Sequence, residues 1–182
     1  PTMPDFAIVF AVTGLDETPR GQRRRVTAFL VDVGTPGFDI KIGNRSVSYR
    51  GYNTYALSFS DVRLGPDQIL GKEGEGLELA GKWLGMGRVW VGASCCGKAE
   101  RMFGMAADWA ANRKQFGQAI GKFQGTGFKL ADMAVELRAA DLLVDDAVRR
   151  ANSGTMTDID ASMVKLYCSE MLHRVADSTV QI

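Results

Sequence analysis

The hydrophobic periodicity of the sequence changes once, near residue 76, and this change most constrains the fold. Before it, short runs rich in β-branched residues alternate apolar and polar side chains. After it, apolar residues recur every three or four positions. The first pattern is typical of strands and the second of amphipathic helices. We therefore expect an α+β protein, with an antiparallel β-domain portion followed by an up-down helical bundle.

Four runs in the first 70 residues predict strands. Residues 7–13 and 25–33 indicate two antiparallel neighbours, joined by a long polar hairpin loop over residues 14–24. Residues 38–42 and 55–62 alternate in the way that half-buried strands do. Four strands would leave an open sheet edge, which soluble proteins avoid. Part of the sheet is therefore expected to lie outside this chain.

Three long helices are predicted in the remainder. They cover about 76–111, about 123–153, and the stretch from a cap at Thr157 or Asp158 to the chain end. The first is rich in glycine, which indicates close approach by another backbone or a ligand, or a break near residues 85–87. Three helices of this length usually have a fourth partner. We expect two domains, 1–70 and 71–182, with the bundle truncated before its last helix.

Composition excludes several classes of function. The net charge is +1, from 22 basic and 21 acidic residues, so nothing indicates nucleic-acid binding. No apolar run is long enough for a membrane span. Three cysteines and one histidine form neither a disulfide framework nor a metal-binding pattern, which favours a reducing compartment. Cys168 is expected to be a core residue, and His173 to be structural or exposed.

The segment 113–124 interrupts two helical patterns and carries an unusual set of side chains. Arg113 offers a planar fork of donors suited to phosphate, and Gln124 offers both a donor and an acceptor. Two apolar–glycine pairs lie between them. This set would suit a phosphate-bearing cofactor. On spacing alone, a helix–helix turn with a solvated arginine is the slightly favoured interpretation.

A second basic cluster lies in the expected hairpin loop, at Arg20, Arg23, Arg24 and Arg25. It could contact a phosphorylated ligand. A solvated loop is the favoured interpretation, because charged side chains on a polar loop are normally exposed to water and need no ligand.

Six short motifs in a fixed order carry a resemblance to a known family. They are residues 70–76, Gly87-Arg88, 113–117, Gln124, 130–133 and 180–182. In this order and spacing the sequence resembles the acyl-CoA dehydrogenase family over nearly the whole chain. The resemblance implies that the chain is an internal fragment, from the later strands of the middle β-domain to the third helix of the C-terminal helical domain.

The resemblance also implies an activity. Members of the family bind FAD and oxidise an acyl-CoA thioester to the 2,3-enoyl-CoA, removing the α-proton and passing the β-hydrogen as hydride to flavin N5. An electron-transfer flavoprotein then accepts the electrons. A homotetramer (or homodimer) in the cytoplasm is expected, or in the mitochondrial matrix of a eukaryote. The alternatives are an acyl-CoA oxidase or other oxygen-using flavoenzyme of the same fold, and a non-catalytic helical assembly module.

The family's cofactor-binding residues match four positions of this sequence. Arg113 corresponds to an arginine at the FAD pyrophosphate, supplied to a neighbouring subunit. Phe116 corresponds to an aromatic residue at the adenosine side of the flavin. Gln124 and Gln181 correspond to glutamines whose amides bind the same cofactor.

Two further positions match substrate-binding residues. Arg88 corresponds to an arginine near the acyl-CoA pocket, with an internal salt bridge as an equal alternative. Thr13 stands where some members place a serine that touches the CoA moiety. No catalytic residue is assigned, because Gly87 occupies the place where some members carry the glutamate base. The base is therefore expected beyond Ile182.

Overall fold

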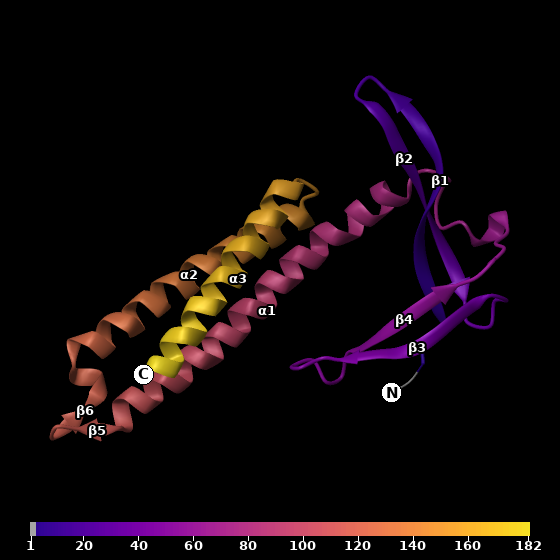
Figure 1. Cartoon of the computed structure of the whole chain (residues 1–182). Coiled ribbons are helices and arrows are strands. Elements are labelled where there is room, and N and C mark those ends of the chain that lie inside the picture. Colours follow the sequence, from indigo (N-terminus) through magenta and orange to yellow (C-terminus); the bar gives the residue numbers. More distant parts are fainter. Residues whose placement is uncertain (1–2) are drawn as a thin grey trace. The chain divides into compact units, whose positions relative to one another are not determined.

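The computed structural model describes residues 3–182, which form strands followed by long helices (Figure 1). The predicted α+β class is confirmed. The chain divides into two compact units, one ending at Gly81 and the other beginning at Lys82, and each is described by itself. Within the described residues, no helix has the length and apolarity needed to span a membrane. The predicted domain boundary at residue 70 stays a prediction.

The first unit begins with a long two-stranded ribbon. β1 (Phe6–Thr18) pairs antiparallel with β2 (Gly21–Asp32), as predicted. The long loop predicted over residues 14–24 is wrong, because the strands continue almost to the turn and Thr18 pairs with Gly21. Gly21 has a φ of 104°, which glycine adopts without steric cost. A bulge between Val12 and Gly14 shifts the register.

A second, separate ribbon follows. β3 (Phe38–Arg45) pairs antiparallel with β4 (Asn53–Phe59). The fourth strand therefore begins and ends earlier than the predicted range 55–62. The rings of Phe38 and Phe59 stack with centroids 4.9 Å apart, which joins the two strand ends.

The segment after β4 returns to β2. A 3₁₀ turn (η1, Pro66–Gln68) precedes Leu70, whose N–H donates to the carbonyl of Ala28 at 2.8 Å. Glu75 then forms a parallel bridge with Val26. The glycine-rich stretch 71–76 is thereby held along β2, and α1 begins from it.

Three helices follow, and they agree closely with the predicted ranges. α1 covers Gly76–Asn112, α2 covers Gln124–Asn152 and α3 covers Asp158–Gln181. α1 is continuous, so the break considered near residues 85–87 does not occur. The Thr157 side chain caps α3 by accepting from the N–H of Asp160, whose carboxylate accepts from the N–H of Thr157.

The core of the second unit is built from small and flexible side chains on all three helices. Its largest fully buried members are Met171, Val164, Val175 and Cys168. The glycines of α1 were predicted to allow close approach by another backbone or a ligand, but at Gly92 the approaching group is a side chain, since a Cβ there would lie 2.4 Å from Val164 Cγ1. Cys168 is buried and His173 is exposed, as expected.

Candidate functional site

The connection between α1 and α2 is a miniature β-hairpin. β5 (Lys114–Gln115) pairs with β6 (Gln118–Ala119) around a two-residue turn at Phe116 and Gly117. Both turn residues have positive φ, 50° and 80°, as a type I′ turn requires. The simple helix–helix turn considered for this segment is therefore too plain a description.

The hairpin presents an aromatic ring to the solvent. Phe116 is 93% exposed, and it occupies a left-handed conformation that non-glycine residues rarely adopt. Its ring lies edge-on to that of Phe123, with centroids 6.2 Å apart. A large apolar side chain held in this way contributes little to the core, so its exposed face is available to a ligand.

Arg113 lies at the base of the hairpin. Its carbonyl accepts from the N–H of Ile120 at 2.8 Å, which closes the loop, while its guanidinium lies 5.8 Å from the centre of the Trp109 ring. Arg113 is exposed and has no ion pair among residues 3–182. Its planar fork of donors therefore remains free for an anionic partner.

Two glutamines lie at the same end of the bundle. Gln124 is the first residue of α2, and Gln181 is the last residue of α3, which runs antiparallel to α2 (Figure 1). Both are exposed. Ile182, next to Gln181, packs against the hydrophobic core and anchors the end of α3.

Among residues 3–182, no hydrogen bond or ion pair engages the side chains of Arg113, Gln124 and Gln181. A free guanidinium suits a phosphate, two exposed amides suit polar atoms, and an exposed ring suits an aromatic group. Arg113, Phe116 and Gln124 belong to the connection from α1 into α2, whereas Gln181 comes from α3. The set fits a ligand that combines phosphates with an aromatic ring system. The assignment of each residue stays a prediction.

Arg88 lies within α1, far from the C-terminal end of that helix at Asn112, which Arg113 follows. The 24 residue steps from Arg88 to Asn112 span about 36 Å at ~1.5 Å per residue, so Arg88 and Arg113 do not share one site. Arg88 is half-buried. The internal salt bridge considered as its alternative role is not seen among the described residues. Its role toward a substrate stays a prediction.

Thr13 lies in the first unit, at the bulge of β1. Its hydroxyl is 2.7 Å from the hydroxyl of Thr27, and the Thr27 hydroxyl accepts from the N–H of Gly74 at 2.9 Å. Thr13 is exposed, whereas Thr27 is completely buried. Sequence reasoning selected Thr13 but missed Thr27 and Gly74.

The four clustered arginines have different surroundings. Arg25 forms ion pairs with Asp16 at 3.1 Å and with Glu73 at 3.9 Å, although its Nε meets no acceptor in hydrogen-bond geometry. Its side chain passes beside Gly14 and Gly74, where any Cβ would lie within 2.9 Å of it. Arg25 therefore has a structural role, and the interpretation of the cluster as a solvated loop is wrong for this residue. Its three neighbours in the cluster are exposed.

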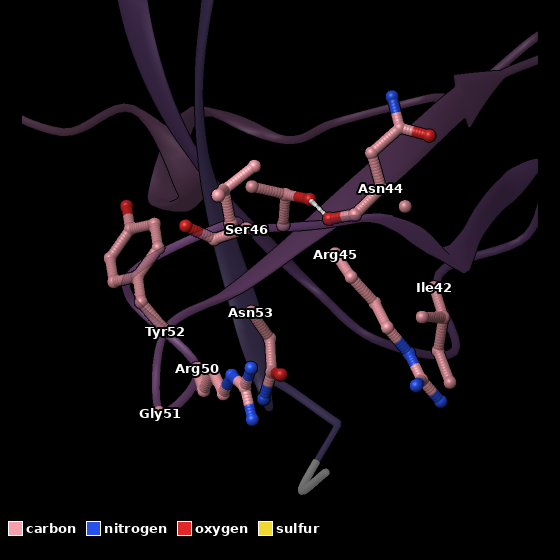
Figure 2. Close-up of a pocket in the computed structure, with 11 residues that line it drawn as sticks. Ile42, Asn44, Arg45, Ser46, Arg50, Gly51, Tyr52 and Asn53 are labelled. Carbon is pink, nitrogen blue, oxygen red and sulfur yellow. Dashed lines mark hydrogen bonds between the residues drawn. The ribbon is translucent and has the colours of Figure 1, made fainter.

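A pocket of about 820 Å³ lies at the loop end of the β3–β4 ribbon (Figure 2). Arg45, Arg50 and Asn53 contribute polar groups to it, and the Thr54 hydroxyl donates to the carbonyl of Asn44 beside it. None of the predicted site residues lines this pocket. In the part of the chain that the structure describes, no group of three or more His, Cys, Asp or Glu side chains could hold a metal ion.

Comparison with known families gives a match over most of the helical region. Residues 74–182 match the family described as acyl-CoA dehydrogenase, C-terminal domain. This range begins at the glycine-rich stretch beside β2 and includes the three helices with Arg88, Arg113, Gln124 and Gln181.

Individual relatives extend the similarity to nearly the whole chain. An acyl-CoA dehydrogenase of Bacillus subtilis is 38% identical, over 98% of this chain and 46% of that protein. The caffeyl-CoA reductase–Etf complex subunit CarC of Acetobacterium woodii is 33% identical, over 98% and 46%. The structure of butyryl-CoA dehydrogenase from Megasphaera elsdenii has a TM-score of 0.85 at 35% identity, over 97% and 45%. The chain thus spans less than half the length of these relatives.

Proposed function

The chain belongs to the acyl-CoA dehydrogenase family, and on that premise we propose that the whole protein is an FAD-dependent acyl-CoA dehydrogenase. It would oxidise an acyl-CoA thioester to the 2,3-enoyl-CoA. Bound FAD would accept the hydride that leaves the β-carbon. The activity is proposed for the whole protein, because this chain covers less than half of its relatives.

The observation that carries the proposal is the exposed donor set at the α1–α2 connection, together with Gln181 at the end of α3. Arg113, free of any ion pair among the described residues, would bind the FAD pyrophosphate. Phe116, 93% exposed on its left-handed turn, would pack against the adenosine side. The amides of Gln124 and Gln181 would bind further polar atoms of the cofactor.

An exposed donor set on the outer end of a helical bundle suits a cofactor held partly by another subunit. We therefore propose that these four residues bind the FAD of a neighbouring copy, in a homotetramer or homodimer. Electron-transfer flavoprotein is the proposed electron acceptor, and one relative is named as part of such a complex. The proposed compartment is the cytoplasm, or the mitochondrial matrix in a eukaryote.

Two residues are proposed to contact the substrate. Arg88, half-buried and without an ion pair in the described chain, would lie near the acyl-CoA pocket. Thr13 would touch the CoA moiety through its exposed hydroxyl. Gly87, which has no side chain, cannot remove the α-proton. The catalytic carboxylate is therefore proposed to come from a residue outside this chain, beyond Ile182.

The test is spectroscopic. The whole protein, purified, should be yellow and should release FAD on denaturation, and an acyl-CoA should bleach the flavin absorbance without oxygen. Electron-transfer flavoprotein should then reoxidise the enzyme faster than air does. Rapid reoxidation by air alone would identify an oxidase instead. A colourless protein that takes up no FAD when it is supplied would reject flavin chemistry and favour an assembly module.

A further inference from the structure

Three polar groups from distant parts of the first unit form a short hydrogen-bonded chain. The N–H of Gly74 donates to Thr27 Oγ1 at 2.9 Å, and Thr27 Oγ1 lies 2.7 Å from Thr13 Oγ1. Thr27 is 0% exposed, while Thr13, the last group of the hydrogen-bonded series, is exposed. The series of hydrogen bonds therefore runs from a backbone donor, through a buried hydroxyl, to the surface.

The direction of the central bond follows from the burial of Thr27. Its oxygen already accepts from Gly74, and Thr13 is the one acceptor within reach of its proton among the described residues. If Thr13 donated instead, the Thr27 proton would be buried without an acceptor, at a cost that folded proteins avoid. Thr27 therefore donates to Thr13. The proton of Thr13 is then left to point away from Thr27, toward solvent.

We propose that Thr27 is a positioning residue, which holds Thr13 as an outward hydrogen-bond donor to a phosphate oxygen of CoA. The inference rests on the proposed function, in which Thr13 touches the CoA moiety. Donors in series polarise one another, so a hydroxyl that accepts from Thr27 is a better donor at its own proton. An anionic oxygen is the acceptor that gains most from such a donor.

An arginine lies close to Thr13. Arg25 places its guanidinium against Gly14, the residue after Thr13, where a Cβ would lie 2.9 Å from the terminal nitrogen. Asp16 and Glu73 hold the guanidinium in place. The guanidinium thus lies beside Gly14, but together with its two carboxylates it carries a net charge of −1, so the preference for a phosphate oxygen rests on the hydroxyl donor and not on the local charge.

The backbone around these hydrogen bonds is held firmly. Leu70 and Glu75 are both bonded or bridged to β2, so Gly74 between them keeps its N–H directed at Thr27. Gly76 packs so closely that a Cβ there would lie 2.8 Å from the backbone of Val26 and Ala28. Thr27 therefore acts within a preorganised frame, in which loss of its hydroxyl changes the orientation of Thr13 more than it changes the fold.

The experiment measures CoA binding to the whole holoprotein by calorimetry, together with kcat/KM for an acyl-CoA and for the matching acyl-pantetheine, which lacks the nucleotide phosphates. Thr13→Val and Thr27→Val are each expected to weaken CoA binding about tenfold, as loss of a hydrogen bond to a charged acceptor does. The preference for acyl-CoA over acyl-pantetheine should fall by a similar factor. The double variant should be no worse than Thr13→Val, because both act through one bond.

Two control variants separate orientation from general damage. Thr27→Ser keeps the hydroxyl and should restore CoA binding, whereas Thr35→Val removes a hydroxyl bonded to the carbonyl of Asp32 and should leave CoA binding unchanged. Full CoA affinity in Thr13→Val, which alters an exposed residue, overturns the inference even if Thr27→Val does not fold. Additive losses in the double variant also overturn it, as does an equal loss toward acyl-pantetheine. Absence of CoA binding in the unaltered protein would instead reject the proposed function.

Discussion

The Sγ atoms of Cys96 on α1 and Cys168 on α3 lie 4.0 Å apart in the buried core of the helical unit. Cys168 in turn lies 4.0 Å from the carbonyl of Ala140 on α2, so the two thiols join all three helices. Burial raises the pKa of both thiols above the ordinary value of 9.0. They are therefore protonated structural groups and poor nucleophiles.

This pair predicts a loss of stability at alkaline pH. Above pH 9 the thiols ionise in the unfolded chain but stay protonated in the folded one, so the folded state binds more protons and stability falls as pH rises. The loss should approach about 1.4 kcal/mol per pH unit for each thiol. Urea denaturation at pH 8, 9 and 10 measures it. The Cys96→Ala/Cys168→Ala variant, though less stable, should show a shallower dependence; an identical slope would contradict the assignment.

Two glycines of α1 predict opposite responses to the same substitution. Gly92→Ala places a Cβ 2.4 Å from Val164 Cγ1, so packing of α1 against α3 must adjust, at a cost of about 1–3 kcal/mol. Gly97→Ala meets nothing within 4 Å and should stabilise the helix by about 0.5–1 kcal/mol. Chemical denaturation of both variants checks the contrast. Equal effects would mean that α1 and α3 do not approach as described.

The turn at Phe116 predicts a conflict between stability and cofactor binding. Phe116→Asn creates an Asn-Gly pair, which type I′ turns prefer, and relieves a left-handed phenylalanine, so stability should rise by about 1 kcal/mol. FAD retention should fall, because the exposed ring is lost. The melting temperature of the apoprotein and the flavin content of the purified protein measure the two effects. Unchanged flavin content would remove Phe116 from the proposed site.

Substitution of Arg113 should weaken FAD retention, and a positive charge alone should not fully restore it. Arg113→Ala should weaken FAD retention by roughly 1.5–3 kcal/mol, the value of a hydrogen bond to a charged group. Arg113→Lys should restore only part of it, because a lysine cannot bind phosphate through two parallel bonds. Arg101→Ala on α1 removes an exposed arginine outside the proposed site and serves as the control. Fluorescence titration with FAD distinguishes the three variants.

The cap of α3 predicts sensitivity to acid. Hydrogen bonds from Thr157 lower the pKa of Asp160 below its ordinary value of 3.8. A carboxyl with a depressed pKa stabilises the fold above its unfolded pKa, and this contribution disappears as pH falls through the folded value. Helicity followed by circular dichroism between pH 5 and pH 2 should therefore fall, and Thr157→Ala should shift the fall to higher pH. A variant that tracks the unaltered protein throughout would refute the cap.

The helices could be predicted because their signals are local. Apolar residues on α2 repeat every three or four positions, and Thr157 together with Asp160 marks the start of α3 in the sequence itself. The end of α2 could be predicted equally well, because a glycine after a helix readily adopts the positive φ that ends it, and Gly154 has a φ of 70°. Each of these features depends on residues within one or two turns.

The strands beyond residue 13 could not be predicted, because their partners decide their extent. Asp16 and Glu17 pair with Arg23 and Gln22 in a ribbon that is polar on both faces, so no alternation of apolar residues marks it. The left-handed conformation of Phe116 has no sequence signal either, since phenylalanine normally avoids it.

The candidate site was predictable only as a set of residue types. Arg113 and Gln124 stood out by their chemistry, and the resemblance to a family assigned them roles. The hydrogen bond between Gly74 and Thr27 joins positions 47 residues apart. The residues around either position do not indicate that the two would meet. Long-range contacts of this kind appear only once the chain is folded.

That separation in sequence has a kinetic consequence. α2 and α3 are joined by the short connection 153–157, so their pairing is local and should form early. The bond from Gly74 to Thr27 must close a loop of 47 residues first, which is entropically slower. We expect pulsed hydrogen exchange to protect the amides of α2 and α3 before that of Gly74. Partly folded chains would then have a formed helical pair but would lack the oriented hydroxyl of Thr13.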